Sequence, residues 1–120
     1  MIVIVDDDRS VRVATESLVR SFGFRAKSFG SAEEFLISPE INQASCIITD
    51  LQMPGISGLE LQSDLHDRQN RTPLIFITAF PEEGIKRQAI DAGAYGFLTK
   101  PFDADELKEC ITRALGVGAG

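Results

Sequence analysis

Acidic, hydroxyl and ammonium side chains stand at the ends of apolar runs in this sequence, where a parallel sheet would gather them. They are Asp6, Asp7, Asp50, Thr78 and Lys100. Taken alone, Thr78 fits an ordinary strand residue and Lys100 a solvated surface lysine. Together, carboxylates, a hydroxyl and an ammonium are the groups that phosphoryl transfer uses, because that chemistry is mostly positioning and charge neutralisation. The set therefore predicts a phosphoryl site.

The three acids also predict a cation site. Two unit charges about 4 Å apart repel by about 4 kcal/mol at an effective dielectric constant of about 20, so such a cluster holds either protons or a cation. Mg²⁺ suits the cluster because it binds through one or two carboxylates and keeps several waters. The competing interpretation for Asp7, and the favoured one for Asp8, is that the side chain caps the helix that follows.

The elements that must position these groups are short strands. Four are apolar runs bounded by turn residues, which is typical of buried strands, and one is more polar. In chain order the expected strands are residues 2–5, 25–29, 46–49, 74–78 and 95–99. Asp50 directly follows the third strand, and Pro54 and Gly55 turn the chain soon afterwards.

Helical patterns separate the strands. The first has an apolar stripe that ends at a glycine, formed by Val11, Ala14, Leu18 and Phe22 before Gly23. Three later helix starts show the spacing of a capping box, at Ser31 with Glu34, Ser57 with Glu60, and Asp103 with Glu106. The fourth helix is expected to begin near Pro81, to carry Ile85, Ala89 and Ala92 on one face, and to stop at Gly93.

Alternating strands and helices predict an α/β fold, with a doubly wound parallel sheet of five βα units and helices on both faces. The first, third and fourth strands are continuously apolar and belong in the middle of the sheet, while the second and fifth suit its edges. Right-handed crossovers then give the flavodoxin-like strand order 2-1-3-4-5. The switch point of this sheet would hold Asp6, Asp7 and Asp50.

Length and composition fit one soluble domain. The chain has 120 residues, of which 43% are hydrophobic and 25% charged, so residues 1–115 can bury a core and residues 116–120 are expected to form a flexible tail or linker stub. The formal charge of −6 argues against nucleic acid as a ligand. Neither a signal peptide nor a membrane span is expected. Cys46 and Cys110 suit two reduced thiols in a cytoplasmic protein better than a disulfide or metal pair.

Four motifs together resemble the receiver domains of two-component response regulators. They are Val5-Asp6-Asp7-Asp8, Thr49-Asp50-Leu51-Gln52-Met53-Pro54-Gly55-Ile56-Ser57-Gly58, Ile77-Thr78-Ala79 and Lys100-Pro101-Phe102. Each motif is short, but their order and placement are specific, and the likeness covers residues 2 to about 115. Residues 31–36 and 100–103 further resemble receivers of the nitrogen-fixation-regulator type. Those usually precede a LuxR-type helix-turn-helix output domain, which this chain does not contain.

The resemblance implies roles for the acids. Asp50 would be the carboxylate nucleophile that accepts a phosphoryl group from a phosphohistidine of a partner histidine kinase. Asp7 would bind Mg²⁺ directly, Asp6 mainly through water, and the backbone carbonyl of Gln52 would be a further ligand. The domain would then be a signalling module and not an enzyme, with only self-phosphorylation from a phosphodonor and slow autodephosphorylation.

A conformational switch is implied as well. Thr78 would follow the phosphoryl group and Lys100 would pair with it, aimed by a cis Lys100-Pro101 bond. Phe97 falls where the family keeps a switch aromatic, although a core aromatic fits the position equally well. The switch would change the face formed by the fourth helix, fifth strand and fifth helix, and so control homodimerisation and a transcriptional output domain.

Two positions depart from common family patterns. Gln52 and Phe80 stand two residues after Asp50 and Thr78, where they bear on the lifetime of the phosphoryl group.

Two other functions compete with the receiver interpretation. Residues 2–10 also resemble the first motif of haloacid-dehalogenase-type phosphatases, with Asp6 as nucleophile and Asp8 as acid. Against this alternative, no later strand carries the closing acidic pair and Asp50 has no role. The other alternative is a receiver-like interaction module that is never phosphorylated.

Overall fold

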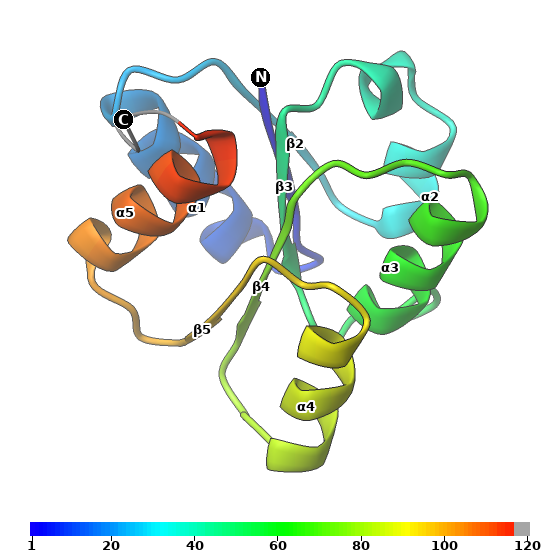
Figure 1. The fold of residues 1–120 in the computed structure, drawn as a ribbon. Helices are drawn as coiled ribbons and strands as arrows, with labels where there is room; N and C mark the ends of the chain where they lie inside the picture. Colours follow the sequence, from blue (N-terminus) through cyan, green and yellow to red (C-terminus); the bar gives the residue numbers. More distant parts are fainter. Residues whose placement is uncertain (117–120) are drawn as a thin grey trace.

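The computed structural model describes residues 1–116 and shows a five-stranded parallel sheet with helices on both of its faces (Figure 1). The strands are β1 (Ile2–Val5), β2 (Ala26–Phe29), β3 (Cys46–Asp50), β4 (Leu74–Thr78) and β5 (Gly96–Thr99). Their order is β2-β1-β3-β4-β5. The predicted flavodoxin-like order is therefore confirmed, and the two polar or glycine-containing strands lie at the edges.

The helices divide into two layers. They are α1 (Arg9–Ser21), α2 (Ala32–Leu36), α3 (Gly58–Asp67), α4 (Glu83–Asp91) and α5 (Ala104–Leu115), with a 3-10 helix η1 at Pro39–Asn42. Side chains of β1 alternate between the layers, since Ile2 and Ile4 pack with α1 and α5 while Val3 and Val5 pack with α2 and α3. Both faces of the central strands are buried, which explains why their sequences are continuously apolar.

Helix starts are mostly where the capping patterns predict them. Ser57 and Asp103 each form a complete capping box with the glutamate three residues later. Ser31 caps α2 by accepting a hydrogen bond from the backbone N–H of Glu34, but the carboxylate of Glu34 accepts from Gly30 at 3.3 Å instead of closing the box.

Two details of the helix predictions are wrong. In α1 the predicted stripe member Ala14 is exposed, and Thr15 and Val19 are the buried residues. Alanine carries too little apolar area to fix the rotation of a helix, and Thr15 is only 3% exposed. The helix α4 begins at Glu83, close to Pro81, and stops before Gly93 as predicted, but Ala92 is an exposed capping residue and not part of the buried face.

The ends of the chain add little to the site. Gly116 caps α5 in the left-handed conformation with φ of 72°, and the rest of the expected tail, residues 117–120, lies outside the described residues. Among residues 1–116, none of the helices has the length and hydropathy needed to cross a bilayer.

Cys46 and Cys110 are free thiols, and burial, followed by the neighbouring Cys110 thiol, raises the pKa of Cys46 to about 12.

Candidate functional site

The sheet register brings the predicted site residues to one edge. Val5 of β1 lies opposite Thr49 of β3, so the residues that follow, Asp6 and Asp50, occupy matching places. On the other side of β3, Asp50 lies opposite Ile77, which directly precedes Thr78. This edge is the carboxyl end of the strands at the point where the strand order reverses, which is where α/β sheets bind ligands.

The three acids form a compact cluster. Asp6, Asp7 and Asp50 each place a carboxylate oxygen within 4.8 Å of the others. The side chain of Asp6 is fully buried, Asp50 is half-buried and Asp7 is exposed. Burial raises the pKa of Asp6, and the nearby Asp50 adds to the rise, while the Asp8 N–H and the Lys100 ammonium oppose it.

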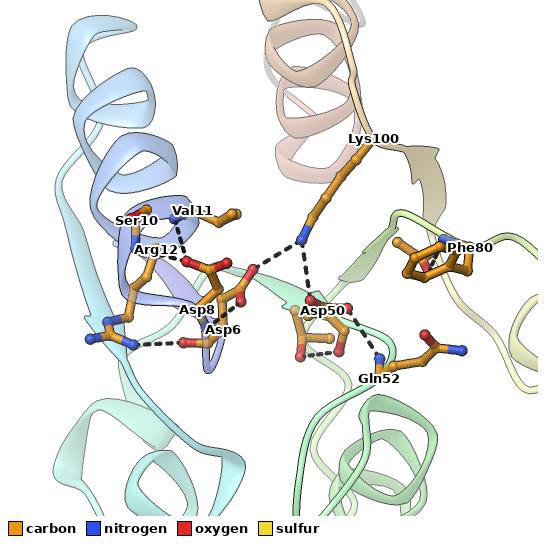
Figure 2. Close-up of polar contacts among 11 residues, drawn as sticks. Asp6, Asp8, Ser10, Val11, Arg12, Asp50, Gln52, Phe80 and Lys100 are labelled. Atoms are coloured by element: carbon orange, nitrogen blue, oxygen red, sulfur yellow. Dashed lines mark hydrogen bonds and ion pairs between the residues drawn. The ribbon is translucent and has the colours of Figure 1, made fainter.

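Lys100 is the cation of the cluster. Its Nζ lies 3.2 Å from Oδ2 of Asp50 and 3.4 Å from Oδ2 of Asp6 (Figure 2). Burial lowers the pKa of Lys100, but the attraction of the two carboxylates outweighs burial, so the pKa lies above its ordinary value. The predicted cis Lys100-Pro101 bond is present. Three carboxylates therefore face one ammonium, and this excess of negative oxygen ligands fits a divalent cation such as Mg²⁺.

Backbone groups of the segment after β3 contact both the carboxylate and the main chain of Asp50. The backbone N–H of Gln52 donates to Oδ1 of Asp50 at 3.1 Å. Gly58, the first residue of α3, packs so closely that an added Cβ would lie 2.7 Å from the backbone oxygen of Asp50. In the sequence, the signal for this close packing is the position of Gly58 directly after the capping Ser57.

Asp8 caps α1, as favoured from the sequence. Its Oδ1 accepts hydrogen bonds from the backbone N–H groups of Ser10 at 2.9 Å and Val11 at 3.3 Å (Figure 2). This use of the side chain leaves Asp8 as a structural cap. It argues against the phosphatase alternative, which needs the Asp8 carboxyl as an acid.

Thr78 is linked to the loop that follows β4. The Thr78 side chain is buried, and its Oγ1 accepts a hydrogen bond from the backbone N–H of Phe80 at 3.2 Å. The Phe80 ring itself is 71% exposed. Movement of the Thr78 hydroxyl is therefore coupled directly to the backbone that carries this ring.

Phe97 lies away from the acids, beneath α4. Its ring centroid is 6.3 Å from that of Phe76, and Nζ of Lys86 lies 5.8 Å from the Phe97 centroid. The ring is half-buried against the core. His66 of α3 is exposed, and its Nε2 lies 2.8 Å from the Ala92 carbonyl oxygen, a contact that links α3 to the end of α4.

Comparison with known proteins places this arrangement in a family. The family model described as the response regulator receiver domain matches residues 2–112. The chain belongs to the receiver domains of response regulators. Response regulator protein TmoT of Ectopseudomonas mendocina is 43% identical to this receiver domain over 115 residues, which are 96% of the chain and 52% of TmoT. Nodulation protein W of Bradyrhizobium diazoefficiens is 37% identical over 114 residues, covering 95% of the chain and 50% of that protein.

Solved structures agree with the assignment. The crystal structure of FixJ-N is 35% identical and superposes with a TM-score of 0.86, over 96% of this chain and 92% of that one. The structure of response regulator StyR is 39% identical with a TM-score of 0.88, over 98% of this chain and 60% of that one. The receiver domain spans about half the length of the curated relatives TmoT and Nodulation protein W.

Proposed function

We propose that this receiver domain accepts a phosphoryl group on Asp50 from a phosphohistidine of a partner histidine kinase, in a Mg²⁺-dependent reaction. The observation that carries the proposal is the setting of the Asp50 carboxylate. Oδ1 accepts the Gln52 N–H, Oδ2 accepts the Lys100 ammonium, and two further acids lie within reach. These contacts fix a carboxylate at the open edge of the sheet, where an incoming phosphoryl group can reach it.

The transfer exchanges one bond to phosphorus for another. A carboxylate oxygen of Asp50 attacks the phosphorus atom, the P–N bond to the kinase imidazole breaks, and an acyl phosphate forms while the imidazole keeps the electron pair and takes up a proton. Lys100 already contacts Oδ2 of Asp50, so a short movement of its ammonium would place it against a phosphoryl oxygen. The Thr78 hydroxyl is the second donor to the phosphoryl oxygens. Thr78 directly follows Ile77, which lies opposite Asp50 on the neighbouring strand.

The metal ligands in this proposal are Asp7, Asp50 and the Gln52 backbone carbonyl, with Asp6 acting mainly through water. When bound, Mg²⁺ supplies charge neutralisation between these acids and the phosphoryl oxygens. The buried Asp6 carboxylate accepts the Asp8 N–H at 2.9 Å and pairs with Lys100. Asp6 is therefore oriented before any cation arrives, which suits a ligand that holds water.

The proposed output is a change in the surface formed by α4, β5 and α5. Phosphorylation would turn the Thr78 hydroxyl away from the Phe80 N–H and let Phe97 repack beneath α4. Ile90 in α4 and Tyr95, directly before β5, are exposed apolar residues that would support homodimerisation. TmoT and Nodulation protein W are about twice as long as this chain, which supports a receiver that controls a further, output domain. The 35% identity to FixJ-N supports the nitrogen-fixation-regulator type and, with it, a C-terminal DNA-binding domain.

Intact mass spectrometry after incubation with Mg²⁺ and acetyl phosphate tests the proposal without the kinase. The protein should gain the mass of one phosphoryl group, and a chelator should prevent the gain. Asp50→Asn should gain nothing, whereas Asp8→Asn, which keeps a capping side chain, should still be labelled. A label found on Asp6 would favour the phosphatase alternative, and an unlabelled wild-type protein would favour the interaction module.

A further inference from the structure

Arg12, in the first turn of α1, reaches back over the loop that carries the acids. Its Nη1 donates a hydrogen bond of 2.8 Å to the backbone carbonyl oxygen of Asp6 (Figure 2). That carbonyl belongs to the peptide unit that joins Asp6 to Asp7. The bond therefore ties the orientation of this peptide unit to the helix.

The placement of the Asp7 carboxylate depends on this hydrogen bond more than that of the neighbouring acids does. The Asp6 carboxylate is held by Lys100 and by the Asp8 N–H, and the Asp8 carboxylate is held by its capping bonds. Within residues 1–116, the Asp7 carboxylate forms no hydrogen bond or ion pair of its own with another side chain or the backbone. The backbone between Asp6 and Asp8 therefore sets the position of the Asp7 Cβ, from which the carboxylate extends.

The space around Arg12 is shaped for the guanidinium. Gly30, directly after β2, faces it so closely that an added Cβ would lie 3.3 Å from Nη1 of Arg12. The end of β1 is also tied to β2, because the Asp6 N–H donates to the Phe29 carbonyl oxygen at 3.1 Å. The backbone of Asp6 is thus held on both sides, by β2 through the N–H of the Val5–Asp6 peptide unit and by α1 through the carbonyl of the Asp6–Asp7 unit.

We infer that Arg12 is a positioning residue for Mg²⁺, because it orients the Asp6–Asp7 peptide and thereby the exposed carboxylate of Asp7. The inference rests on the proposed Mg²⁺-dependent function of the site. The charge of Arg12 and its orienting role predict opposite effects on the affinity for Mg²⁺. A guanidinium close to a cation site repels the cation, so charge alone predicts that removing Arg12 tightens Mg²⁺ binding. Orientation predicts weaker binding, since the loss of a residue that orients metal ligands lowers metal affinity by about 10–100-fold.

The test compares Arg12→Gln with Arg20→Gln. Arg20 makes the same kind of bond near the other end of α1, from Nη2 to the backbone oxygen of Ala26 at 2.5 Å. Titration of the ¹⁵N-labelled proteins with Mg²⁺, followed by the amide signals of the strand ends, gives the dissociation constants. Arg12→Gln should raise the dissociation constant about tenfold, while Arg20→Gln should leave it at the wild-type value.

Each outcome decides the inference. Unchanged or tighter binding in Arg12→Gln overturns it, and so does an equal loss in Arg20→Gln, which would show general destabilisation. If Arg12→Gln does not fold, Arg12→Lys replaces it, because lysine keeps the charge on a shorter side chain; weaker binding supports the inference and wild-type affinity overturns it. A wild-type protein that binds no Mg²⁺ would instead overturn the proposed function, and the inference with it.

Discussion

Lys100 and Asp50 form an ion pair of 3.2 Å across the end of β4, from the loop after β5 to the end of β3. The Lys100 side chain is only 19% exposed, and its second partner, Asp6, is fully buried. In the metal-free protein Lys100 thus compensates part of the repulsion among the acids. A cation or a phosphoryl group that enters the site changes the partners of this ammonium.

The first prediction is that Lys100→Gln destabilises the metal-free protein. Removing one partner of a buried ion pair leaves an uncompensated charge, which costs about 3–5 kcal/mol in fully buried cases; at this partly solvated edge we expect about 1–3 kcal/mol. Mg²⁺ should recover part of the loss, because the cation replaces the missing positive charge. Urea unfolding with and without Mg²⁺ measures both effects.

Lys27→Gln is the matched control for this measurement. Lys27 pairs with Glu40 at 2.6 Å far from the acids, and its side chain is half-exposed. The Glu40 side chain is only 13% exposed, so Lys27→Gln should also cost some stability, but Mg²⁺ should not alter its difference from wild type. A Lys100→Gln protein that behaves like Lys27→Gln would show that Lys100 does not compensate the acids.

The second prediction concerns pH. Burial raises the pKa of Asp6 above its ordinary value of 3.8 in the metal-free protein, whereas the unfolded chain ionises this group normally. The stability that Asp6 contributes is therefore fully present below pH 3.8 and is lost as the pH rises through the raised, folded pKa. The Asp6→Asn side chain cannot ionise, so this variant does not lose that stability. The unfolding free energy of Asp6→Asn relative to wild type should therefore increase as the pH rises.

Urea unfolding in a chelator, from acidic to neutral pH, tests the second prediction. A difference between Asp6→Asn and wild type that stays constant with pH would contradict it. Addition of Mg²⁺ at neutral pH should reduce or reverse the advantage of Asp6→Asn, because the cation stabilises the ionised carboxylate of the wild type.

The third prediction is that phospho-Asp50 decays slowly for the family. Hydrolysis needs a water in line with the phosphorus, opposite the Asp50 oxygen, and we expect the side chains of Gln52 and Phe80 to flank that approach. A phenyl ring can exclude water but cannot orient it. Phe80→Glu and Phe80→Ala should therefore both lose the phosphoryl group faster than wild type, as followed by intact mass over time.

Ile37→Ala is the control for the lifetime measurement. Ile37 follows α2 and is 87% exposed, so this variant also removes an exposed apolar side chain but leaves the site untouched. Its phosphoryl group should decay at the wild-type rate. If the two Phe80 variants decay no faster than Ile37→Ala, the ring does not shield the site.

The fourth prediction concerns assembly. A beryllofluoride mimic of the phosphoryl group should convert monomers into dimers through the surface of α4, β5 and α5, as measured by sedimentation. Ile90→Glu should abolish the dimer, because it places a charge in the apolar part of that surface. Val13→Glu, a comparable change at an exposed residue of α1, which is not part of that surface, should leave the dimer intact. Equal sedimentation of the wild type with and without the mimic would contradict the prediction.

Much of the fold is determined by local patterns in the sequence. Continuous apolar runs identify the central strands, because both faces of a parallel sheet are covered, and the capping boxes at Ser57 and Asp103 mark the helix starts. The order of the strands follows from these patterns and the handedness of crossovers. Because parallel strands end at a common edge, the gathering of Asp6, Asp50 and Lys100 was also predictable.

Only the tertiary structure decides which neighbours each group meets. The apolar stripe predicted from the sequence included Ala14, whereas packing against the sheet buries Thr15 instead. Likewise, no local pattern announces the bond from Arg12 to the Asp6 carbonyl or that from His66 to the Ala92 carbonyl. A long side chain reaches a backbone group through space, and its partner depends on the angles at which whole elements pack, which sequence spacing does not encode.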